Sequence, residues 1–282
     1  MSVTAAQVLW AGQTRLAAQV GPEVAARETR LLLAHAAGWS GAQMLAALHD
    51  PMPPEVQARF EALLDQRISG LSVAHVIGEV EFYGRAFHVG QGDLAPRPDT
   101  ETLIDLALDA PFERLLDLGT GTGVIAVTLL AERAGASGLA CDLEDGFLER
   151  ARRNAVRHGV ADRLAFQPSD WFTDISGKFD LILSNPPYVS EGDYAELAPE
   201  ILIGERREAL TPEGDGLEAY RIIASQVLGY LTPRGRVLVE IGHDQGPAVA
   251  ALFSQSGLAD VAIHGDINDT DRVVSGVNPA KS

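Results

Sequence analysis

The spacing of apolar residues changes once along this chain, near residue 79, and the two spacings predict two kinds of structure. Before that point apolar residues recur every three or four positions, which is the period of amphipathic helices. Proline opens and glycine closes two of these stretches, Pro22 with Gly38 and Pro54 with Gly70, as is common at helix ends. We therefore expect residues 1–75 to form a small bundle of helices.

A short segment with a two-residue period follows the helices. Residues 79–89 alternate between apolar and polar side chains, which is typical of a β-hairpin, and we assign residues 76–95 to a hairpin linker. The next stretch, Pro96 to Glu101, predicts a proline-stiffened loop that enters a helix. Asp99 or Thr100 is expected to cap that helix, because their side-chain oxygens can accept from its first N–H groups.

Beyond the linker, apolar runs are continuous, as in strands buried on both faces of a parallel sheet. Helical stretches separate these runs, which is the order of an open α/β sheet. The expected strands are 114–118, 138–141, 164–167, 179–183, 236–241, 260–264 and 272–277. Three helices are expected: one that follows the first strand and ends near Arg133, one over about 145–158 and one over 216–231. Pro233-Arg234-Gly235 is expected to end the last helix. Residues 96–282 are thus predicted to form one α/β domain with a seven-stranded sheet.

Composition narrows the class of protein. The chain has 282 residues, 46% of them hydrophobic, which is enough for a sizeable core. Its first 20 residues follow a helical pattern rather than that of a signal peptide, and no apolar run approaches the ~18 residues of a membrane span. The single cysteine, Cys141, excludes an intramolecular disulfide and a cysteine-based zinc cluster. We expect a cytoplasmic protein without a membrane segment or a metal site.

The net charge of −17 is unevenly distributed. Residues 1–75 contain 6 acidic and 5 basic side chains, whereas residues 76–282 contain 33 acidic and 17 basic ones. Nucleic-acid binding depends on Lys and Arg that neutralise phosphates, so the second part of the chain is poorly suited to it. The charge favours a protein partner over direct nucleic-acid binding.

A glycine-rich turn, Gly119-Thr120-Gly121-Thr122-Gly123, follows the first parallel strand. Its glycines allow a tight bend and a close approach to a ligand, while the next helix offers N–H groups without intrahelical partners. Asp142 ends the following strand, where a carboxylate can accept from two ribose hydroxyls. Both features are shared with nicotinamide-dependent enzymes, so by themselves they predict only a nucleotide-like cofactor.

Two more polar groups are expected at the same edge of the sheet. Asp170-Trp171 ends the third strand, where the carboxylate can accept from an adenine amino group and the indole can cover the base. Asn185-Pro186-Pro187-Tyr188 ends the strand 179–183. The two prolines stiffen this turn and leave carbonyl groups without competing N–H donors. An amide side chain, carbonyl acceptors and a phenol ring suit a planar –NH2 group that donates hydrogen bonds.

In combination, these four motifs resemble the S-adenosylmethionine-dependent methyltransferases that modify planar –NH2 nitrogens. Within that class the chain resembles the peptide chain release factor glutamine methyltransferases over about residues 20–277. The segments that carry this resemblance are His75–Gly78, Glu81–Gly84, Pro96–Glu101, Glu205–Leu210 and Asp271–Val274. The chain departs from the family pattern at Arg206, where proline is usual, and at Asn268-Asp269, where a glycine is common.

The resemblance implies a Rossmann-like class I methyltransferase sheet, S-adenosylmethionine as cofactor and a release factor as protein substrate. The methyl group would pass to the side-chain nitrogen (N5) of the glutamine in a Gly-Gly-Gln loop. The implied cofactor residues are Gly119, Thr120, Gly121, Thr122, Gly123, Asp142, Asp170, Trp171 and Asn185, and the implied catalytic residues are Asn185, Pro186, Pro187 and Tyr188. By the same resemblance the Asn185 side-chain oxygen and the Pro186 carbonyl accept the two amide hydrogens, and Tyr188 packs on the amide plane.

Several other functions compete with this interpretation. A nucleic-acid adenine N6-methyltransferase would use the same Asn-Pro-Pro-Tyr turn on a flipped base, and the acidic charge argues against it. A glutamine methyltransferase that acts on a ribosomal protein would differ only in its partner. A nicotinamide-dependent dehydrogenase explains the glycines and Asp142 but not residues 185–188. A cofactor-binding adaptor without enzyme activity would not need an intact Asn185–Tyr188 turn, which we call the acceptor turn.

Overall fold

The computed structural model describes residues 3–143 and 145–279 and divides the chain into two compact units. The smaller unit runs to Glu79 and also includes the distant segment Ala198–Gly204. The larger unit comprises Val80–Leu197 and the residues from Glu205 onward. Each unit has its own apolar core and is described by itself.

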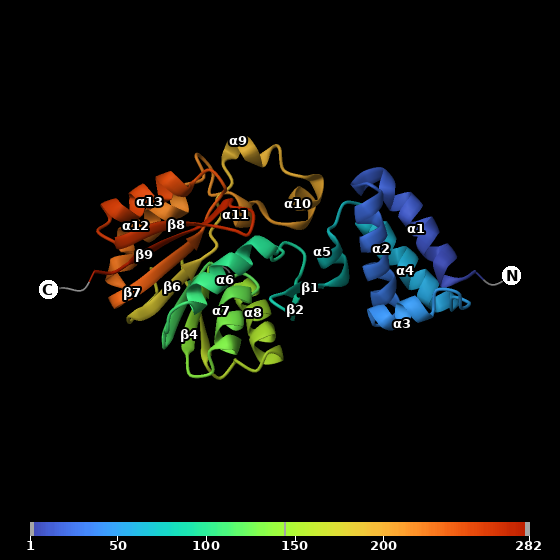
Figure 1. Ribbon diagram of the computed structural model, residues 1–282, viewed down its shortest axis with the longest axis horizontal. Coiled ribbons are helices and arrows are strands. Elements are labelled where there is room, and N and C mark those ends of the chain that lie inside the picture. The colour runs from blue at the N-terminus through green and yellow to red at the C-terminus, as the bar shows by residue number, and fades with distance from the viewer. Residues whose placement is uncertain (1–2, 144, 280–282) are drawn as a thin grey trace. The chain divides into compact units, whose positions relative to one another are not determined.

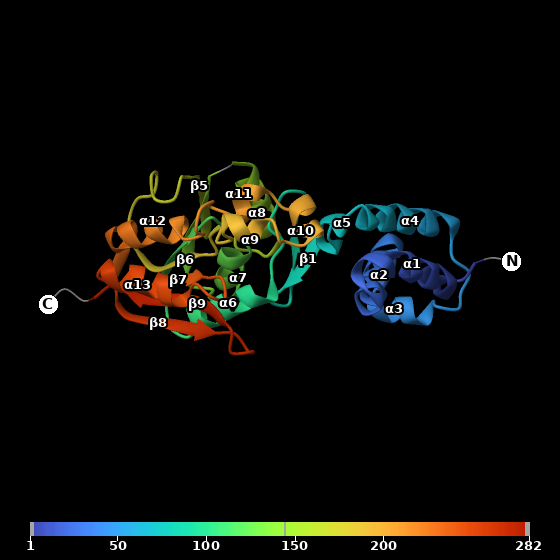
Figure 2. The ribbon, with the colours of Figure 1, turned by 90° about the horizontal axis from the view of Figure 1, so that it is seen from above.

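The smaller unit consists of helices, as the three-to-four-residue spacing predicted. They are α1 (Ala5–Val20), α2 (Pro22–Ala37), α3 (Gly41–Ala46), α4 (Pro54–Ile68), α5 (Val73–Ile77) and α10 (Pro199–Gly204). Within this unit α1 and α2 lie side by side (Figure 2). Gly38 ends α2 in a left-handed conformation with φ of 67°, which confirms its predicted role as the helix stop. Leu16, Leu32 and Phe60 are fully buried in the core of this unit.

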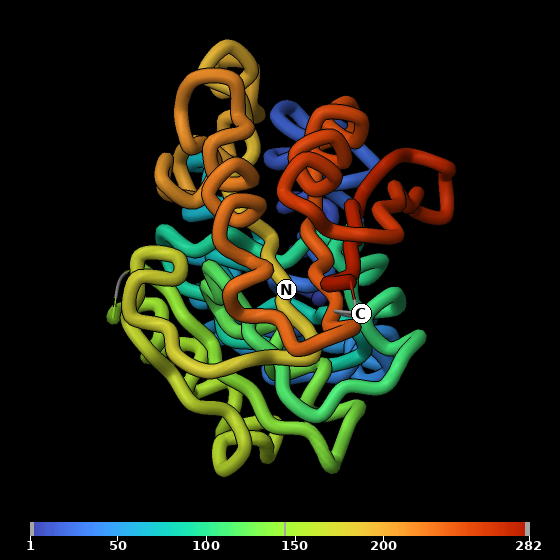
Figure 3. Tube along the Cα trace, turned by 90° about the vertical axis from the view of Figure 1, so that its left-hand side faces the viewer, coloured from blue at the N-terminus to red at the C-terminus, as the bar shows by residue number. Residues whose placement is uncertain are grey.

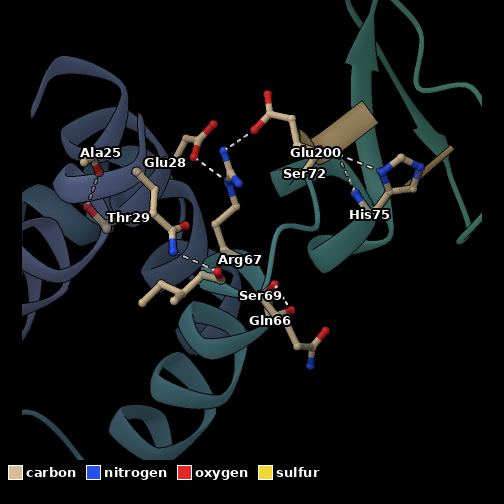
Figure 4. Close-up of polar contacts among 11 residues, drawn as sticks. Ala25, Glu28, Thr29, Gln66, Arg67, Ser69, Ser72, His75 and Glu200 are labelled. Carbon is tan, nitrogen blue, oxygen red and sulfur yellow. Dashed lines mark hydrogen bonds and ion pairs between the residues drawn. The ribbon is translucent and has the colours of Figure 1, made fainter. Parts of the chain in front are cut away.

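One buried arginine links three segments of the smaller unit (Figure 4). The Arg67 guanidinium, on α4, donates to Glu28 on α2 at 2.8 Å and to Glu200 on α10 at 2.6 Å. Only 3% of the Arg67 side chain is exposed. Gly204, at the end of α10, leaves room for the His75 ring, because a Cβ atom there would lie 2.9 Å from His75 Nδ1. These contacts explain why a segment from the second half of the chain belongs to the helical unit.

The larger unit begins with the predicted hairpin, β1 (Glu79–Phe82) and β2 (Arg85–His88). In the described part of the chain its main sheet has seven strands in the order β5-β4-β3-β6-β7-β9-β8. The strands are β3 (Arg114–Leu118), β4 (Ser137–Asp142), β5 (Leu164–Pro168), β6 (Phe179–Ser184), β7 (Leu231–Glu240), β8 (Ala259–Gly265) and β9 (Asp271–Val277). All neighbours pair in parallel except β9, which is antiparallel to both β7 and β8. The sheet confirms the predicted Rossmann-like α/β class (Figure 1).

Helices cover both faces of this sheet. On one face α6 (Glu101–Leu108), α7 (Val124–Glu132) and α8 (Asp145–Arg157) pack over one apolar layer, which contains Leu103 and Leu181. On the other face α12 (Glu218–Gln226) and α13 (Gly246–Gln255) cover a second layer, which contains Phe179 and Ile223. Figure 3 shows these two groups of helices on opposite sides of the sheet. Burial on both faces is the reason that the strands are continuously apolar in sequence.

Some predicted boundaries were wrong. The helix expected over 216–231 ends at Gln226 and is followed by a 3₁₀ turn, Val227–Gly229. Pro233-Arg234-Gly235 does not end that helix but lies inside β7, where the pairing with β6 shifts register. An irregular stretch of strand can accept a proline that a regular central strand would reject. α13 and the short helices α9 (Glu191–Tyr194) and α11 (Arg207–Leu210) were not predicted.

Thr100 is the N-cap residue of α6, as predicted, but the expected side-chain capping bond was wrong. Pro98–Thr100 forms a 3₁₀ turn ahead of the helix, and no side chain there accepts from its first N–H groups. Asp99 pairs instead with Arg272 at 3.3 Å. Among the described helices, none combines the length and apolar character needed to cross a bilayer.

Candidate active site

The turn between β3 and α7 requires glycine at three positions. Gly119, Gly121 and Gly123 have φ angles of 67°, 54° and 82°, in the region that L side chains rarely adopt. A Cβ atom on Gly123 would also lie 3.0 Å from the Cβ of Ala151 on α8. Around the first two glycines no such contact exists within 4 Å, so their backbone faces open space beside the cavities described below. The predicted close approach of backbone to ligand is therefore sterically possible here.

A buried carboxylate holds this turn in place. Asp117, near the end of β3, accepts from the Thr120 hydroxyl at 2.7 Å and from the Ala126 N–H at 3.3 Å. Burial raises the pKa of Asp117 to about 7, although both hydrogen bonds lower it. Asp117 was not among the predicted site residues. The signal that could have found it is a carboxylate inside an otherwise apolar strand, directly before the glycines.

A cavity of about 260 Å³ lies at the carboxyl ends of β3, β4 and β5. Asp142, Asp170 and Trp171 line it together with Gly119, so three strand ends that are distant in sequence meet at one site. The Gly121 N–H donates to Asp142 Oδ2 at 2.8 Å, which fixes this carboxylate at the cavity. A carboxylate can accept several hydrogen bonds, so this contact is compatible with further donors.

A second cavity, of about 180 Å³, adjoins the first and shares Gly119, Asp142 and Pro187 with it. Asn185 lines this second cavity, together with Thr120, Gly121 and Thr122. The amide nitrogen of Asn185 donates to the Thr100 hydroxyl at 3.3 Å. Its Oδ1 is buried and has no hydrogen-bond partner among the described residues. The structure thus brings the glycine turn and the acceptor turn to one continuous space.

Not every predicted residue lines these cavities. Gly123, Pro186 and Tyr188 are absent from both linings. The Tyr188 ring packs against the apolar layer under α12, and its carbonyl accepts from Gln245 Nε2 at 2.9 Å. Burial, followed by the nearby charge of Glu240, raises the pKa of Tyr188 to about 12. The phenol therefore stays neutral at ordinary pH.

Two polar residues that were not predicted as site residues lie next to Asn185, and one of them, Thr100, also lines the second cavity. Thr100 and Glu240 are each only 2% exposed. Burial raises the pKa of Glu240 to about 7, and hydrogen bonds from Thr100 and Asn185 lower it in part. Glu240 follows the apolar run Val237-Leu238-Val239, so an acidic residue at a strand end was again the available signal.

The loop that includes Arg97 is tied down by a buried carboxylate. Arg97 donates to Glu205 at 2.6 Å. The neighbouring Arg206 lines the second cavity, with its guanidinium 3.7 Å from the centre of the Phe147 ring. At the other departure from the family pattern, Asp269 has φ of 58°, a conformation that favours glycine but that Asp and Asn also adopt.

Family profiles match both units of the chain. The "Methyltransferase small domain" profile matches residues 98–233, and the "PrmC N-terminal domain" profile matches residues 7–78. Together they cover the helical region and the glycine and acceptor turns. The first profile ends within β7, before Glu240.

Curated relatives resemble the chain over nearly its whole length. A release factor glutamine methyltransferase of Cereibacter sphaeroides is 50% identical over 276 residues, which are 98% of this chain and 99% of the relative. A protein of the same name from Caulobacter vibrioides is 38% identical and covers 100% of this chain and 99% of its own length. That of Agrobacterium fabrum is 39% identical over 88% of this chain and 89% of the relative.

Solved structures share the fold at low sequence identity. A methyltransferase from Pyrococcus furiosus aligns with a TM-score of 0.54 and 16% identity over 78% of this chain and 98% of that one. The hMettl16 catalytic domain, in complex with MAT2A 3'UTR hairpin 6, aligns with a TM-score of 0.57 and 18% identity over 77% of this chain and 82% of that one. At such identities the likeness establishes the methyltransferase fold alone.

Proposed function

The chain belongs to the release factor glutamine methyltransferase family, and we propose that it methylates the side-chain amide nitrogen (N5) of the glutamine in the Gly-Gly-Gln motif of peptide chain release factors. The methyl donor is S-adenosylmethionine. The observation that carries this proposal is the position of Asn185, which lines a cavity that continues into the space beside the glycine turn and Asp142 and whose Oδ1 has no hydrogen-bond partner among the described residues. A hydrogen-bond acceptor for the substrate amide and a nucleotide-like site thus adjoin.

The first cavity has the residue types that S-adenosylmethionine requires. Asp142 would accept from the ribose hydroxyls, and Asp170 would accept from the adenine amino group beside the apolar face of Trp171. Thr120, Gly121 and Thr122 line the second cavity and would approach the remainder of the cofactor through their backbone. When bound, the cofactor supplies a methyl group on a positively charged sulfur.

The acceptor turn has to orient a poor nucleophile. An amide lone pair is delocalised into its carbonyl group, so two acceptors on the –NH2 hydrogens are needed to direct nitrogen density at the methyl carbon. Asn185 Oδ1 would accept one hydrogen, and the Pro186 carbonyl the other. Orientation of this kind can supply up to ~7–11 kcal/mol of the barrier.

Atoms and charge balance without a strong base. The nitrogen–carbon bond forms as the carbon–sulfur bond breaks, which neutralises the sulfur and leaves a proton to be lost from the methylated nitrogen. That nitrogen is strongly acidic once its lone pair is used, so water can remove the proton after transfer. Tyr188 remains a neutral phenol and would contribute packing beside the turn.

The helical unit has no group in either cavity lining, and we assign it to recognition of the release factor away from the target loop. The excess of acidic residues in 76–282 favours a protein substrate over nucleic acid. We also propose that the enzyme acts in the cytoplasm, as the composition of the chain led us to expect.

The deciding experiment is a methyl-transfer assay with labelled S-adenosylmethionine. We expect transfer to an intact release factor, none to a release factor whose Gly-Gly-Gln glutamine is replaced by alanine, and none to DNA, RNA or ribosomal protein. Label in the nucleic acid instead would support the adenine N6 reaction. Label in a ribosomal protein would keep the chemistry but change the partner.

A further inference from the structure

The proposed reaction requires the Asn185 side chain to present its oxygen, not its nitrogen, to the substrate, and an amide alone does not fix that orientation. A primary amide carries an acceptor at one end and two donors at the other, and the two ends have nearly the same shape. Only the orientation with Oδ1 toward the substrate can accept from a glutamine –NH2 group. The flipped orientation would present a donor to a donor. Some neighbouring group must therefore select the orientation.

The first selecting contact comes from Thr100. Its hydroxyl accepts from the Asn185 amide nitrogen at 3.3 Å, on the side of the amide opposite Oδ1. Thr100 is 2% exposed, and its side chain does not cap α6. A hydroxyl can either accept a hydrogen bond or donate one. Thr100 alone therefore does not determine whether the nitrogen or the oxygen of the Asn185 amide faces it.

The second contact comes from Glu240, which removes this ambiguity. Ser184 on β6 pairs with Val239 on β7, so the residues that follow, Asn185 and Glu240, leave the sheet side by side. The Glu240 carboxylate lies within reach of the Thr100 and Asn185 side chains, which lower its pKa in part, and its buried Oε2 has no hydrogen-bond partner among the described residues. The Tyr220 hydroxyl donates to the Glu240 backbone carbonyl at 2.8 Å and holds the end of β7 in position.

An ionised carboxylate can only accept hydrogen bonds. It therefore orients the Thr100 hydrogen toward itself, which leaves a Thr100 lone pair for the Asn185 –NH2 group. Any flipped Asn185 would direct Oδ1 at a carboxylate and a hydroxyl oxygen, which is electrostatically unfavourable in a buried setting. Asp99 and Arg272 also act on this carboxylate, with opposite effects on its charge, and neither lines the cavities.

We propose that Glu240 is a positioning residue for methyl transfer: with Thr100, it holds the Asn185 amide with Oδ1 facing the substrate nitrogen. This inference rests on the proposed function, because it specifies how the acceptor of that reaction is oriented. Glu240 does not itself touch the substrate. It is enclosed behind Thr100 and Asn185 and lines neither cavity.

The first test is a set of single variants assayed at pH 8, above the raised pKa of Glu240, with release factor as substrate. Glu240→Gln introduces a donor that can hold Asn185 in the flipped orientation, and Thr100→Val removes the intermediate hydroxyl. We expect kcat to fall by about tenfold or more in each, since hydrogen bonds to charged groups have about this effect. Cofactor affinity measured by calorimetry should stay unchanged in Glu240→Gln, because Glu240 lines neither cavity. Thr100→Ser, which keeps the hydroxyl, should retain most of kcat.

Ser184→Ala is the matched control. Ser184 is fully buried next to Asn185, but its hydroxyl donates to the Leu118 carbonyl rather than to this group. We expect its kcat to stay near that of the parent. A fall in kcat equal to that of Glu240→Gln would show that any buried polar change at these strand ends has the same effect, and it would overturn the proposal.

The second test is a double-mutant cycle with Asn185→Asp. Aspartate at 185 places two carboxylates side by side, which repel and which a single Thr100 hydrogen cannot satisfy. Adding Glu240→Gln removes the repulsion and provides an amide donor for the new aspartate. We expect the double variant to be at least about tenfold more active than Asn185→Asp alone, although Glu240→Gln lowers activity in the parent.

The outcomes separate this inference from the proposed function. If Glu240→Gln changes the activity by the same factor in the parent and in Asn185→Asp, Glu240 does not act through Asn185. An inactive Glu240→Gln protein with no rescue in the cycle would also contradict positioning and would point to proton acceptance. Near-normal methyl transfer by a folded Asn185→Ala protein would instead overturn the acceptor site itself.

Discussion

At the residue scale, carboxylates at strand ends differ in burial and in pKa according to their surroundings. Asp117, Asp142 and Glu240 are carboxylates at the ends of β3, β4 and β7, but their surroundings differ. Asp142 borders both cavities and accepts from a glycine N–H. The other two are buried among apolar strands, where desolvation keeps their pKa near 7. Carboxylates thus border a cavity at one strand end and are enclosed within the protein at the two others.

Removing the Asp142 carboxylate should weaken cofactor binding without unfolding the protein. Asp142→Ala loses the proposed ribose contact and the anchor of the Gly121 N–H. We expect an affinity loss of roughly 1.5–3 kcal/mol, the range for hydrogen bonds to charged groups, measured by calorimetry with S-adenosylmethionine. Asp142→Asn, which keeps an acceptor for Gly121, should lose less. Unchanged affinity in folded Asp142→Ala would exclude this residue from the cofactor site.

The raised pKa of Asp117 makes a prediction about pH and stability. Its pKa is about 7 in the folded protein and 3.8 as the ordinary value, so the folded state holds the proton more tightly. The resulting stabilisation is complete below pH ~4 and is lost as pH rises through about 7. Between pH 5.5 and 8 this amounts to about 2 kcal/mol.

Asp117→Asn is the test of that pH dependence, because it cannot titrate but keeps an acceptor for Thr120 and Ala126. Denaturant unfolding of the cofactor-free protein should show a smaller fall in stability between pH 5.5 and 8 than the parent shows. Comparison with the parent cancels the contribution of the other titrating groups. Identical pH slopes would mean that Asp117 is ionised throughout this range.

At the scale of elements, α10 belongs to a different unit from the segments on either side of it in sequence. Those segments are part of the larger unit, whereas α10 packs in the helical unit through Glu200 and Gly204. The central contact is the Arg67 guanidinium with Glu28 and Glu200. A buried ion pair adds little net stability, but removal of one partner leaves the other charge buried.

Arg67→Ala should therefore destabilise the helical unit strongly. We expect a loss of about 3–5 kcal/mol in the free energy of unfolding, measured with denaturant on the full chain, because Glu28 stays buried without its partner. The matched control is Arg15→Ala, whose partners Glu61 and Asp65 lie at 2.5 Å but in an exposed setting. That change should cost less than about 1 kcal/mol. Equal losses would show that burial does not determine the contribution of Arg67.

At the scale of the whole molecule, we propose that the two units divide the function between them. Every residue that lines the two cavities belongs to the larger unit. The helical unit instead presents large apolar side chains to solvent, among them Trp10 on α1, which is 70% exposed, and Leu45 on α3. Exposed tryptophan is enriched at protein interfaces, which agrees with the proposed role in binding a release factor.

Trp10→Ala tests that role in the full chain. We expect KM for an intact release factor to rise by about tenfold or more, while kcat, cofactor affinity and the KM for a short Gly-Gly-Gln peptide stay unchanged. Val156→Ala, at an exposed apolar residue on α8 of the larger unit, should have no effect on any of these values. A truncation at residue 76 would be a poorer test, because it would also strip α10 of the helices that it packs against. An unaltered KM in Trp10→Ala would remove this surface from substrate recognition.

Much of the fold was predictable because strong local patterns agree with the tertiary structure. The helices at Pro22 and Pro54, the hairpin and the seven strands all follow from periodicity and from glycine and proline. The exceptions depend on distant neighbours. Pro233 lies in β7 rather than before it because pairing with β6 tolerates an irregular stretch there, and a local rule does not contain that information.

In the candidate site, too, some features follow from local patterns and others depend on distant neighbours. Gly119, Asp142, Asp170, Trp171 and Asn185 were identifiable because each motif follows a predicted strand, and parallel strands end at one edge of a sheet. Tyr188 belongs to the same motif, yet its ring packs into the layer under α12. Sequence spacing gives the position of a residue on the chain but not the direction of its side chain.

The sequence alone therefore determined the fold class, the family and the edge of the sheet where the candidate site lies, because these depend on short-range patterns. Only the tertiary structure showed that the Thr100 hydroxyl accepts from Asn185 instead of capping its helix, that Glu240 follows the strand residue paired with Ser184, and that α10 joins the helical unit. These contacts join residues 55 or more positions apart. Their formation depends on the packing of the whole chain, which no local pattern records.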